Sequence, residues 1–228
     1  MSKHLSKEEL EHDALVENVE KASKFINKNK TTLLSVLIGF FVVAGLLVGY
    51  QFFSDNQEAK AQNNLATAEQ FYQEGDYDKA LNGDSYNLTY GFAAIANEYS
   101  STNAGNLALY YASVSSYKLG DIESALDYFS RYDAPKGILG VGPISFHASL
   151  LELNESLEKA AETYLKAANW DKNESTTPYN MYKAAEIYYE LGSLAKAQEL
   201  VDEILEKYPD NSEAVNTQRL SGMIAAAN

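Results

Sequence analysis

The chain has 228 residues, no cysteine and a formal net charge of −14, from 18 Lys and Arg against 32 Asp and Glu. This length is enough for one domain with a buried core and further appendages. The acidity argues against non-specific nucleic-acid binding, which needs a basic surface. The lack of cysteine excludes disulfides, thiolate metal sites and thiol nucleophiles.

Residues 1–32 form an arm without net charge, because six lysines balance six acidic residues. The sequence Ser6-Lys-Glu-Glu9 fits a capping box, which predicts a helix start. Apolar residues then recur at roughly helical spacing among charges, which predicts an amphipathic helix over about 7–28. Such a helix would rest on a membrane surface or on a partner, or it would be a solvated helix that only carries its lysines.

Residues 33–53, LLSVLIGFFVVAGLLVGYQFF, form a stretch of 21 residues without a charge. At 1.5 Å per residue they reach roughly 30 Å, the thickness of a hydrocarbon core, which predicts a single transmembrane helix. A cleaved signal peptide is the alternative, but its apolar region would be shorter and would not usually follow about 30 polar residues.

Four lysines, Lys21, Lys24, Lys28 and Lys30, precede this stretch. The positive-inside rule therefore places the N-terminal arm in the cytoplasm and residues 54–228 across the membrane, in the periplasm if the cell is bacterial. The expected span contains Gly45-Leu-Leu-Val-Gly49, a spacing that lets another helix approach closely. Glycine is common in membrane helices, so an ordinary span is the alternative reading of these two glycines.

Residues 54–228 carry the whole charge imbalance and repeat themselves. Four turns are each followed by an alanine, in EGDYDKAL, LGDIESAL, NESLEKAA and LGSLAKAQ, and the alanines are 45, 35 and 37 residues apart. These repeat-packing alanines are Ala80, Ala125, Ala160 and Ala197. A second small residue comes before each turn, and this set is Ala68, Ser113, Ala148 and Ala185. Small residues at this spacing let two helices cross closely, and a turn glycine ends the first helix in a left-handed conformation.

The pattern resembles the tetratricopeptide repeat, a helix–turn–helix unit of about 34 residues. We therefore expect an all-α fold in which a single transmembrane helix precedes a solenoid of about four repeats, with a capping helix over 212–224. The 45-residue interval predicts about ten extra residues around LNGDSYNLTYG. Unit one carries Asp84 where the second helix of the other units has a large residue, and unit three lacks a turn glycine.

Counting along the repeats places tyrosines at first-helix positions that normally face the concave groove of such a solenoid. The candidate groove residues are Tyr72, Tyr110, Tyr117, Lys118, Tyr179, Tyr182, Glu186 and Tyr189. Tyrosine combines broad apolar contact with a polar tip, which suits adaptable peptide binding. The alternative is that several of these tyrosines only pack between helices. Lys118 is the sole cation expected among them, so a basic clamp for a peptide carboxylate is not predicted.

The sequence carries no zinc-protease, serine-hydrolase, phosphate-loop or dinucleotide motif. Its three histidines, His4, His12 and His147, are scattered, and we expect His147 to be a packing or surface residue. The many acidic residues are expected on a solvated solenoid face. We therefore expect no enzyme, no cofactor, no metal site and no small-molecule substrate.

The order of parts is a short arm, a Lys-flanked span, an acidic helical segment and then the repeats. Together with TNAGNLALYYASVSSYKLGDIESALDYF (102–129), this order resembles the ancillary subunit of the bacterial SecYEG translocon, in its Bacteroidetes form. The resemblance implies a non-catalytic protein-binding module in the bacterial inner membrane, with most of the chain in the periplasm. Its implied partners are translocon subunits, emerging polypeptides or periplasmic chaperones.

Two other functions fit the same architecture. One is a structural scaffold for cell-envelope assembly or secretion machinery, which would use the convex face and the glycines of the span. The other is a mitochondrial import receptor, which is also anchored by its N-terminus. The missing basic clamp and the low arginine content argue against the receptor.

Overall fold

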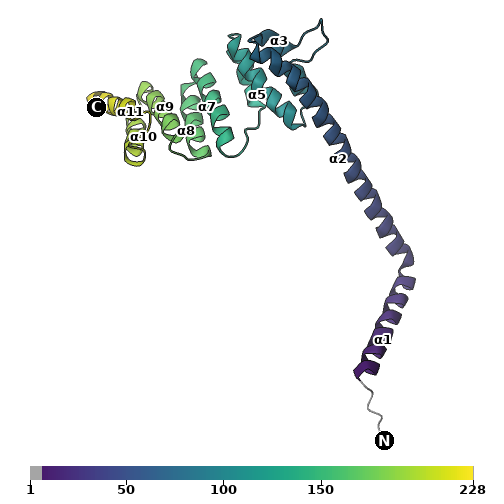
Figure 1. Cartoon of the computed structure of the whole chain (residues 1–228). Coiled ribbons are helices and arrows are strands. Elements are labelled where there is room, and N and C mark those ends of the chain that lie inside the picture. Colours follow the sequence, from purple (N-terminus) through teal and green to yellow (C-terminus); the bar gives the residue numbers. More distant parts are fainter. Residues whose placement is uncertain (1–6, 228) are drawn as a thin grey trace. The chain divides into compact units, whose positions relative to one another are not determined.

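The computed structural model describes residues 7–227, which form eleven helices and no strand (Figure 1). The all-α prediction is confirmed. Ser6, with the capping box, and His4 lie outside the described residues. The chain divides into two compact units, Met1–Asn56 and Gln57–Asn228.

The first unit contains α1 (Lys7–Lys28) and the beginning of α2 (Lys30–Gln73). Two exposed ion pairs stabilise α1, and each joins residues one helical turn apart. Glu17 lies 2.7 Å from Lys21, and Glu20 lies 3.2 Å from Lys24. Helix α2 is the one described helix that is long and apolar enough to cross a membrane, and none of its apolar window is buried.

The second unit begins with the end of α2 and continues as helix pairs in chain order (Figure 1). The helices are α3 (Tyr77–Asn82), α4 (Phe92–Glu98), α5 (Asn103–Lys118), α6 (Ile122–Ser130), α7 (Ile138–Leu153), α8 (Leu157–Trp170), α9 (Thr177–Glu190), α10 (Leu194–Lys207) and α11 (Ala214–Ala227). Unit one pairs the end of α2 with α3 and α4, and units two, three and four are α5–α6, α7–α8 and α9–α10. Helix α11 follows the last unit and packs against α10 and α9.

The small residues of the repeat pattern lie where the two helices of each unit cross. All eight are fully buried, and they are Ala68, Ala80, Ser113, Ala125, Ala148, Ala160, Ala185 and Ala197. In unit two the contact is a hydrogen bond as well, because the Ser113 hydroxyl donates to the Ala125 carbonyl at 2.7 Å. The larger residues four positions after the alanine, Phe129, Tyr164 and Val201, are also buried. The crossings leave no room for a longer side chain at the alanine positions.

The four turns between paired helices share one geometry. Gly75, Gly120 and Gly192 adopt positive φ angles of 71–84°, and Glu155 takes the same place in unit three with φ 56°. In each turn, the N–H of this residue and that of the next donate to carbonyls three and five residues earlier, at 2.8–3.1 Å. This is the Schellman motif, which satisfies the last carbonyls of a helix. Unit three thus makes the same turn without the glycine that favours it.

Unit one accommodates its extra residues in a loop between α3 and α4. The expectation that Asp84 lies in the second helix is wrong, because α3 ends at Asn82 and Asp84 starts the loop. The Asp84 carboxylate accepts hydrogen bonds from the backbone N–H of Tyr86 and the amide of Asn87, at 2.8 and 2.9 Å. Tyr86 and Leu88 project from this loop and are 97% and 87% exposed.

One carboxylate fastens the end of α2 to α5. Glu58 accepts hydrogen bonds from the backbone N–H groups of Asn103 and Ala104, at 2.7 and 3.2 Å. These two residues begin α5, where N–H groups have no partner within the helix and a negative charge is favourable. Glu58 therefore caps a helix that is 45 residues further along the chain.

The core of the second unit has three parts. The first joins the end of α2 to α3, α4 and α5 around Phe92 and Ile95. The last and largest joins α7 to α11, and includes Ile187, Ile204 and Ile224. Between them lies a small cluster of three buried residues, Ala125, Phe129 and Leu150, with partly buried aromatic rings around it. The contact between α6 and α7 therefore has the thinnest core.

Candidate functional site

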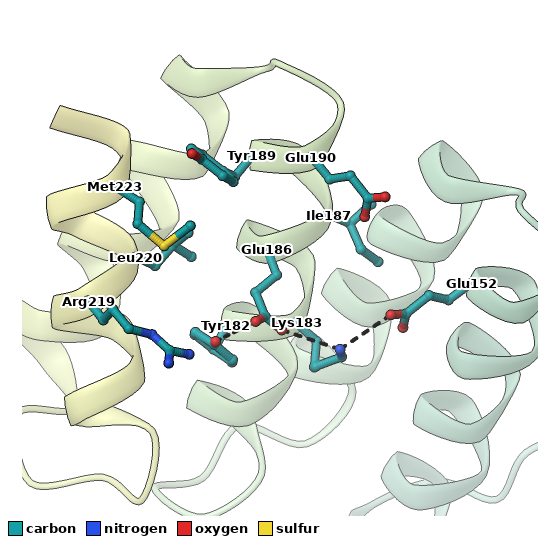
Figure 2. Close-up of a pocket in the computed structure, with 10 residues that line it drawn as sticks. All are labelled: Glu152, Tyr182, Lys183, Glu186, Ile187, Tyr189, Glu190, Arg219, Leu220 and Met223. Carbon is teal, nitrogen blue, oxygen red and sulfur yellow. Dashed lines mark hydrogen bonds and ion pairs between the residues drawn. The ribbon is translucent and has the colours of Figure 1, made fainter. Parts of the chain in front are cut away.

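A groove of about 540 Å³ lies between α7, α9 and α11 (Figure 2). It is lined by Glu152, Tyr182, Lys183, Glu186, Ile187, Tyr189, Glu190, Arg219, Leu220 and Met223. Helix α9 supplies most of this lining, because residues 182, 186 and 190 recur at four-residue spacing on one face. The groove therefore follows the first helices of units three and four and ends at the last helix.

The polar side of the groove is an ion-pair network centred on Lys183. Its ammonium lies 3.4 Å from a Glu152 oxygen and 3.3 Å from a Glu186 oxygen. Each carboxylate also accepts a hydrogen bond from a tyrosine hydroxyl, Glu152 from Tyr164 at 3.0 Å and Glu186 from Tyr182. Figure 2 shows the Lys183 ammonium between the two carboxylates. Both carboxylates are thus held by partners within the protein.

Burial and charge keep Tyr164, Tyr182 and Lys183 in their ordinary protonation states at neutral pH. Burial, reinforced by Glu186, raises the pKa of Tyr182 to about 12, and burial beside Glu152 raises the pKa of Tyr164 as well. Burial alone would lower the pKa of Lys183, but Glu152 and Glu186 outweigh it and the pKa is raised. The tyrosines therefore remain donors, and Lys183 remains a cation.

The base of the groove is apolar. Ile187 and Leu220 are buried and form this floor on either side of Glu186, while Met223 is 43% exposed and Tyr189 is half-buried. Figure 2 shows Tyr189, Leu220 and Met223 together on the side of the groove away from the Lys183 network. An apolar floor beside a few fixed polar groups is the usual composition of a binding site. Among the described residues, no group of three or more His, Asp or Glu could hold a metal ion.

The groove contains three of the eight candidate residues from the sequence, Tyr182, Glu186 and Tyr189. Tyr182 is only 6% exposed, so its ring packs inward and its hydroxyl serves the polar network. The expectation that Lys118 is the sole cation among the groove positions is wrong, because Lys183 and Arg219 line this groove.

The other candidates lie elsewhere in the solenoid. Tyr72 packs edge-on against Tyr111 at 5.3 Å between ring centroids, and Tyr110 lies 5.5 Å from Tyr132. These two tyrosines belong to interhelical packing, which is the alternative the sequence left open. Tyr117, Lys118 and Tyr179 are exposed residues outside the groove.

Two further sequence candidates have clear surroundings. His147 stacks on Phe129 with centroids 4.6 Å apart, so it is a packing residue at the α6–α7 contact. A methyl group added at Gly45 or Gly49 would meet no atom within 4 Å, so their side of α2 is open.

Sequence reasoning missed Arg219, Leu220 and Met223, because α11 follows the last repeat and has no counterpart to compare. The available signal was the apolar spacing of Leu220 and Ile224, which marks one face of α11 as buried. That face turns α11 toward α9, and its neighbouring residues Arg219 and Met223 then reach the groove. Lys183 was missed because its role depends on Glu152, which is 31 residues earlier.

Comparison with known proteins agrees with the observed fold. Residues 179–211 match the tetratricopeptide repeat family. The chain is similar to the solved structure of "kinesin light chain nearly identical TPR-like repeats" from Podosopora anserina, with a TM-score of 0.55 and 10% identity, over 75% of this chain and 88% of that one. A single-substitution variant of that protein gives the same TM-score and identity, over 87% of its chain. No curated protein sequence matches significantly.

Proposed function

We propose that this tetratricopeptide-repeat protein is a non-catalytic module that binds polypeptide segments in the groove between α7, α9 and α11. The observation that carries the proposal is the composition of the groove, an apolar floor of Ile187 and Leu220 beside the fixed network of Lys183. Its volume of about 540 Å³ lies within the range of roughly 300–1,000 Å³ that is typical of pockets for small ligands, so it has room for part of a polypeptide segment.

The stretch 33–53 is the proposed anchor of this module. It is uncharged, and its side chains are exposed, as a surface in contact with lipid would be. The preceding lysines favour a cytoplasmic N-terminus. The protein would then be a single-pass protein of the bacterial inner membrane with its repeats in the periplasm.

We further propose that the module serves the Sec translocon and holds emerging polypeptides or periplasmic chaperones. The support is the order of parts in the sequence, with an arm, a Lys-flanked span and acidic repeats. Tethering near the translocon would raise the local concentration of clients, so affinities on the order of µM to mM would suffice.

Site-specific photo-crosslinking in native membranes tests this function. A photoreactive residue replacing Met223, in the groove, should crosslink to exported polypeptides or chaperones, and one replacing Val215 is the matched control. Val215 lies on the same helix, is 78% exposed and does not line the groove. Equal crosslinking from both sites would refute groove binding, and enrichment of another complex instead of translocon subunits in mild detergent would refute the Sec assignment.

A structural scaffold is the second candidate function, and the open side of α2 at Gly45 and Gly49 favours it. A scaffold held by helix packing in the membrane should lose its partner when both glycines become leucine. Crosslinking from position 223 should persist in the same variant if the groove acts independently. Retention of every partner by the double variant would exclude this packing role.

A further inference from the structure

We infer that the groove prefers polypeptide segments that place a lysine or arginine beside an apolar side chain, and that Glu190 is the residue that recognises this cation. This inference rests on the proposed function of the groove and names the chemistry of its ligand. It follows from which charges in the groove are already paired and which are not.

Two of the three carboxylates in the groove are occupied. Glu152 has Lys183 and the Tyr164 hydroxyl as partners, and Glu186 has Lys183 and the Tyr182 hydroxyl. A ligand cation would have to compete with a partly buried ammonium for either carboxylate. These two residues therefore shape the groove more than they attract a charged ligand.

Glu190 is different, because its carboxylate has no ion pair or hydrogen bond to any other described residue. It is exposed at the end of α9 and lines the groove with Ile187 one turn earlier. Figure 2 shows Glu190 on the α7 side of the apolar floor, away from the Lys183 network. A ligand that placed an apolar side chain on Ile187 would bring its neighbouring residues close to this carboxylate.

The remaining cation of the groove lies on the opposite wall. Arg219 belongs to α11, and its positive charge lowers the pKa of Tyr182 against the larger effect of burial. Figure 2 shows Arg219 beside Tyr182, across the groove from Glu190. The lining thus has three carboxylates and two cations, and residues 54–228 together carry a net charge of −14. Both the local and the long-range field favour a basic ligand near Glu190.

Three peptide probes test this inference on the full-length chain in detergent micelles. Each is a short peptide with a central leucine, an acetylated N-terminus and an amidated C-terminus, so that no terminal charge contributes. The residues that flank the leucine are lysine in one probe, glutamine in the second and glutamate in the third. Fluorescence anisotropy at low and at physiological salt gives the three affinities.

Exposed ion pairs contribute modestly, so we expect the lysine probe to bind about two- to fivefold more tightly than the glutamine probe. Glu190→Gln should remove this preference, and Glu190→Lys should invert it in favour of the glutamate probe. Glu199→Gln and Glu199→Lys are the matched controls, because Glu199 is an exposed residue of α10 outside this groove. They change the net charge equally and should leave the preference in place.

The possible outcomes separate the inference from the proposed function. Binding of all three probes with equal affinity, or a preference that Glu190→Lys does not change, overturns the inference while groove binding stands. A preference that Glu199→Lys changes as much as Glu190→Lys also overturns it, because the general field of the domain would then be responsible. Failure of every probe to bind at millimolar concentration overturns the proposed groove function together with the inference.

Discussion

The third turn of the solenoid should become more stable when Glu155 is replaced by glycine. Glu155 has φ 56°, whereas the corresponding residues of the other three turns are glycines. A left-handed conformation costs a residue with a Cβ about 1–2 kcal/mol. Glycine avoids this cost but loses about 0.4–1 kcal/mol more through the entropy of the unfolded chain. Because the Glu155 side chain is exposed, the substitution removes no packing.

The net expected gain for Glu155→Gly is therefore about 0.5–1 kcal/mol, which corresponds to a rise in melting temperature of roughly 1–4 °C for a domain of this size. Thermal unfolding of the full-length chain in detergent, followed by circular dichroism, measures it. Glu155→Gln is the control, because it removes the same negative charge from an acidic protein without changing the backbone preference. Gly192→Ala is the converse test, since a methyl group there meets nothing within 4 Å and only the conformational cost remains.

A gain from Glu155→Gln as large as that from Glu155→Gly would refute this reasoning, because relief of charge repulsion would then explain both. The same holds if Gly192→Ala leaves the melting temperature unchanged. Either result would mean that the positive φ of these turns does not limit their stability.

Three further predictions concern packing, capping and pH. Ala197→Leu would place a large side chain at a fully buried crossing, so unfolding should become easier by about 1–3 kcal/mol in thermal melts, while Ala195→Leu on the exposed side of α10 should cost little. Glu58→Gln should weaken the cap of α5 by about 1 kcal/mol, visible as faster amide exchange at Asn103, and unchanged exchange there would contradict the capping role. Burial, aided by the charge of Lys166, lowers the pKa of His147 in the folded protein. The unfolded chain, whose histidine pKa is about 6.5, therefore takes up a proton at His147 more readily than the folded protein does. The free energy of unfolding should fall as the pH drops from about 6.5 toward the lower pKa of the folded state. His147→Phe should flatten this part of the stability profile, and an unchanged slope would show that the histidine does not contribute.

The crossings of the solenoid were predictable because they depend on local spacing. Ala80, Ala125, Ala160 and Ala197 recur with the period of the repeat, and nothing larger than alanine fits where the helices of a unit meet. The sequence predicted about ten extra residues in unit one, but it did not predict that α3 ends at Asn82. Spacing gives the number of inserted residues and not the residue at which a helix ends.

The candidate groove was predictable only in part. Tyr182, Glu186 and Tyr189 follow from counting along one helix, whereas Lys183 acquires its role from Glu152 on another helix. Arg219 belongs to α11, which lies beyond the last repeat and therefore outside the periodic comparison. The positions of Lys183 and Arg219 in the site thus depend on contacts between helices, which the repeat spacing does not predict.

The thin core at the α6–α7 contact has a consequence for how the protein responds to mechanical load. The groove lies wholly among helices of the last core, and the end of α2 belongs to the first core. A polypeptide that pulls on the groove while α2 is held would transmit force through the small cluster of Ala125, Phe129 and Leu150. Repeats contact mainly their neighbours, so loss of this one interface would leave the contacts within each half in place. Under tension, we expect this junction to separate before either half loses its helices.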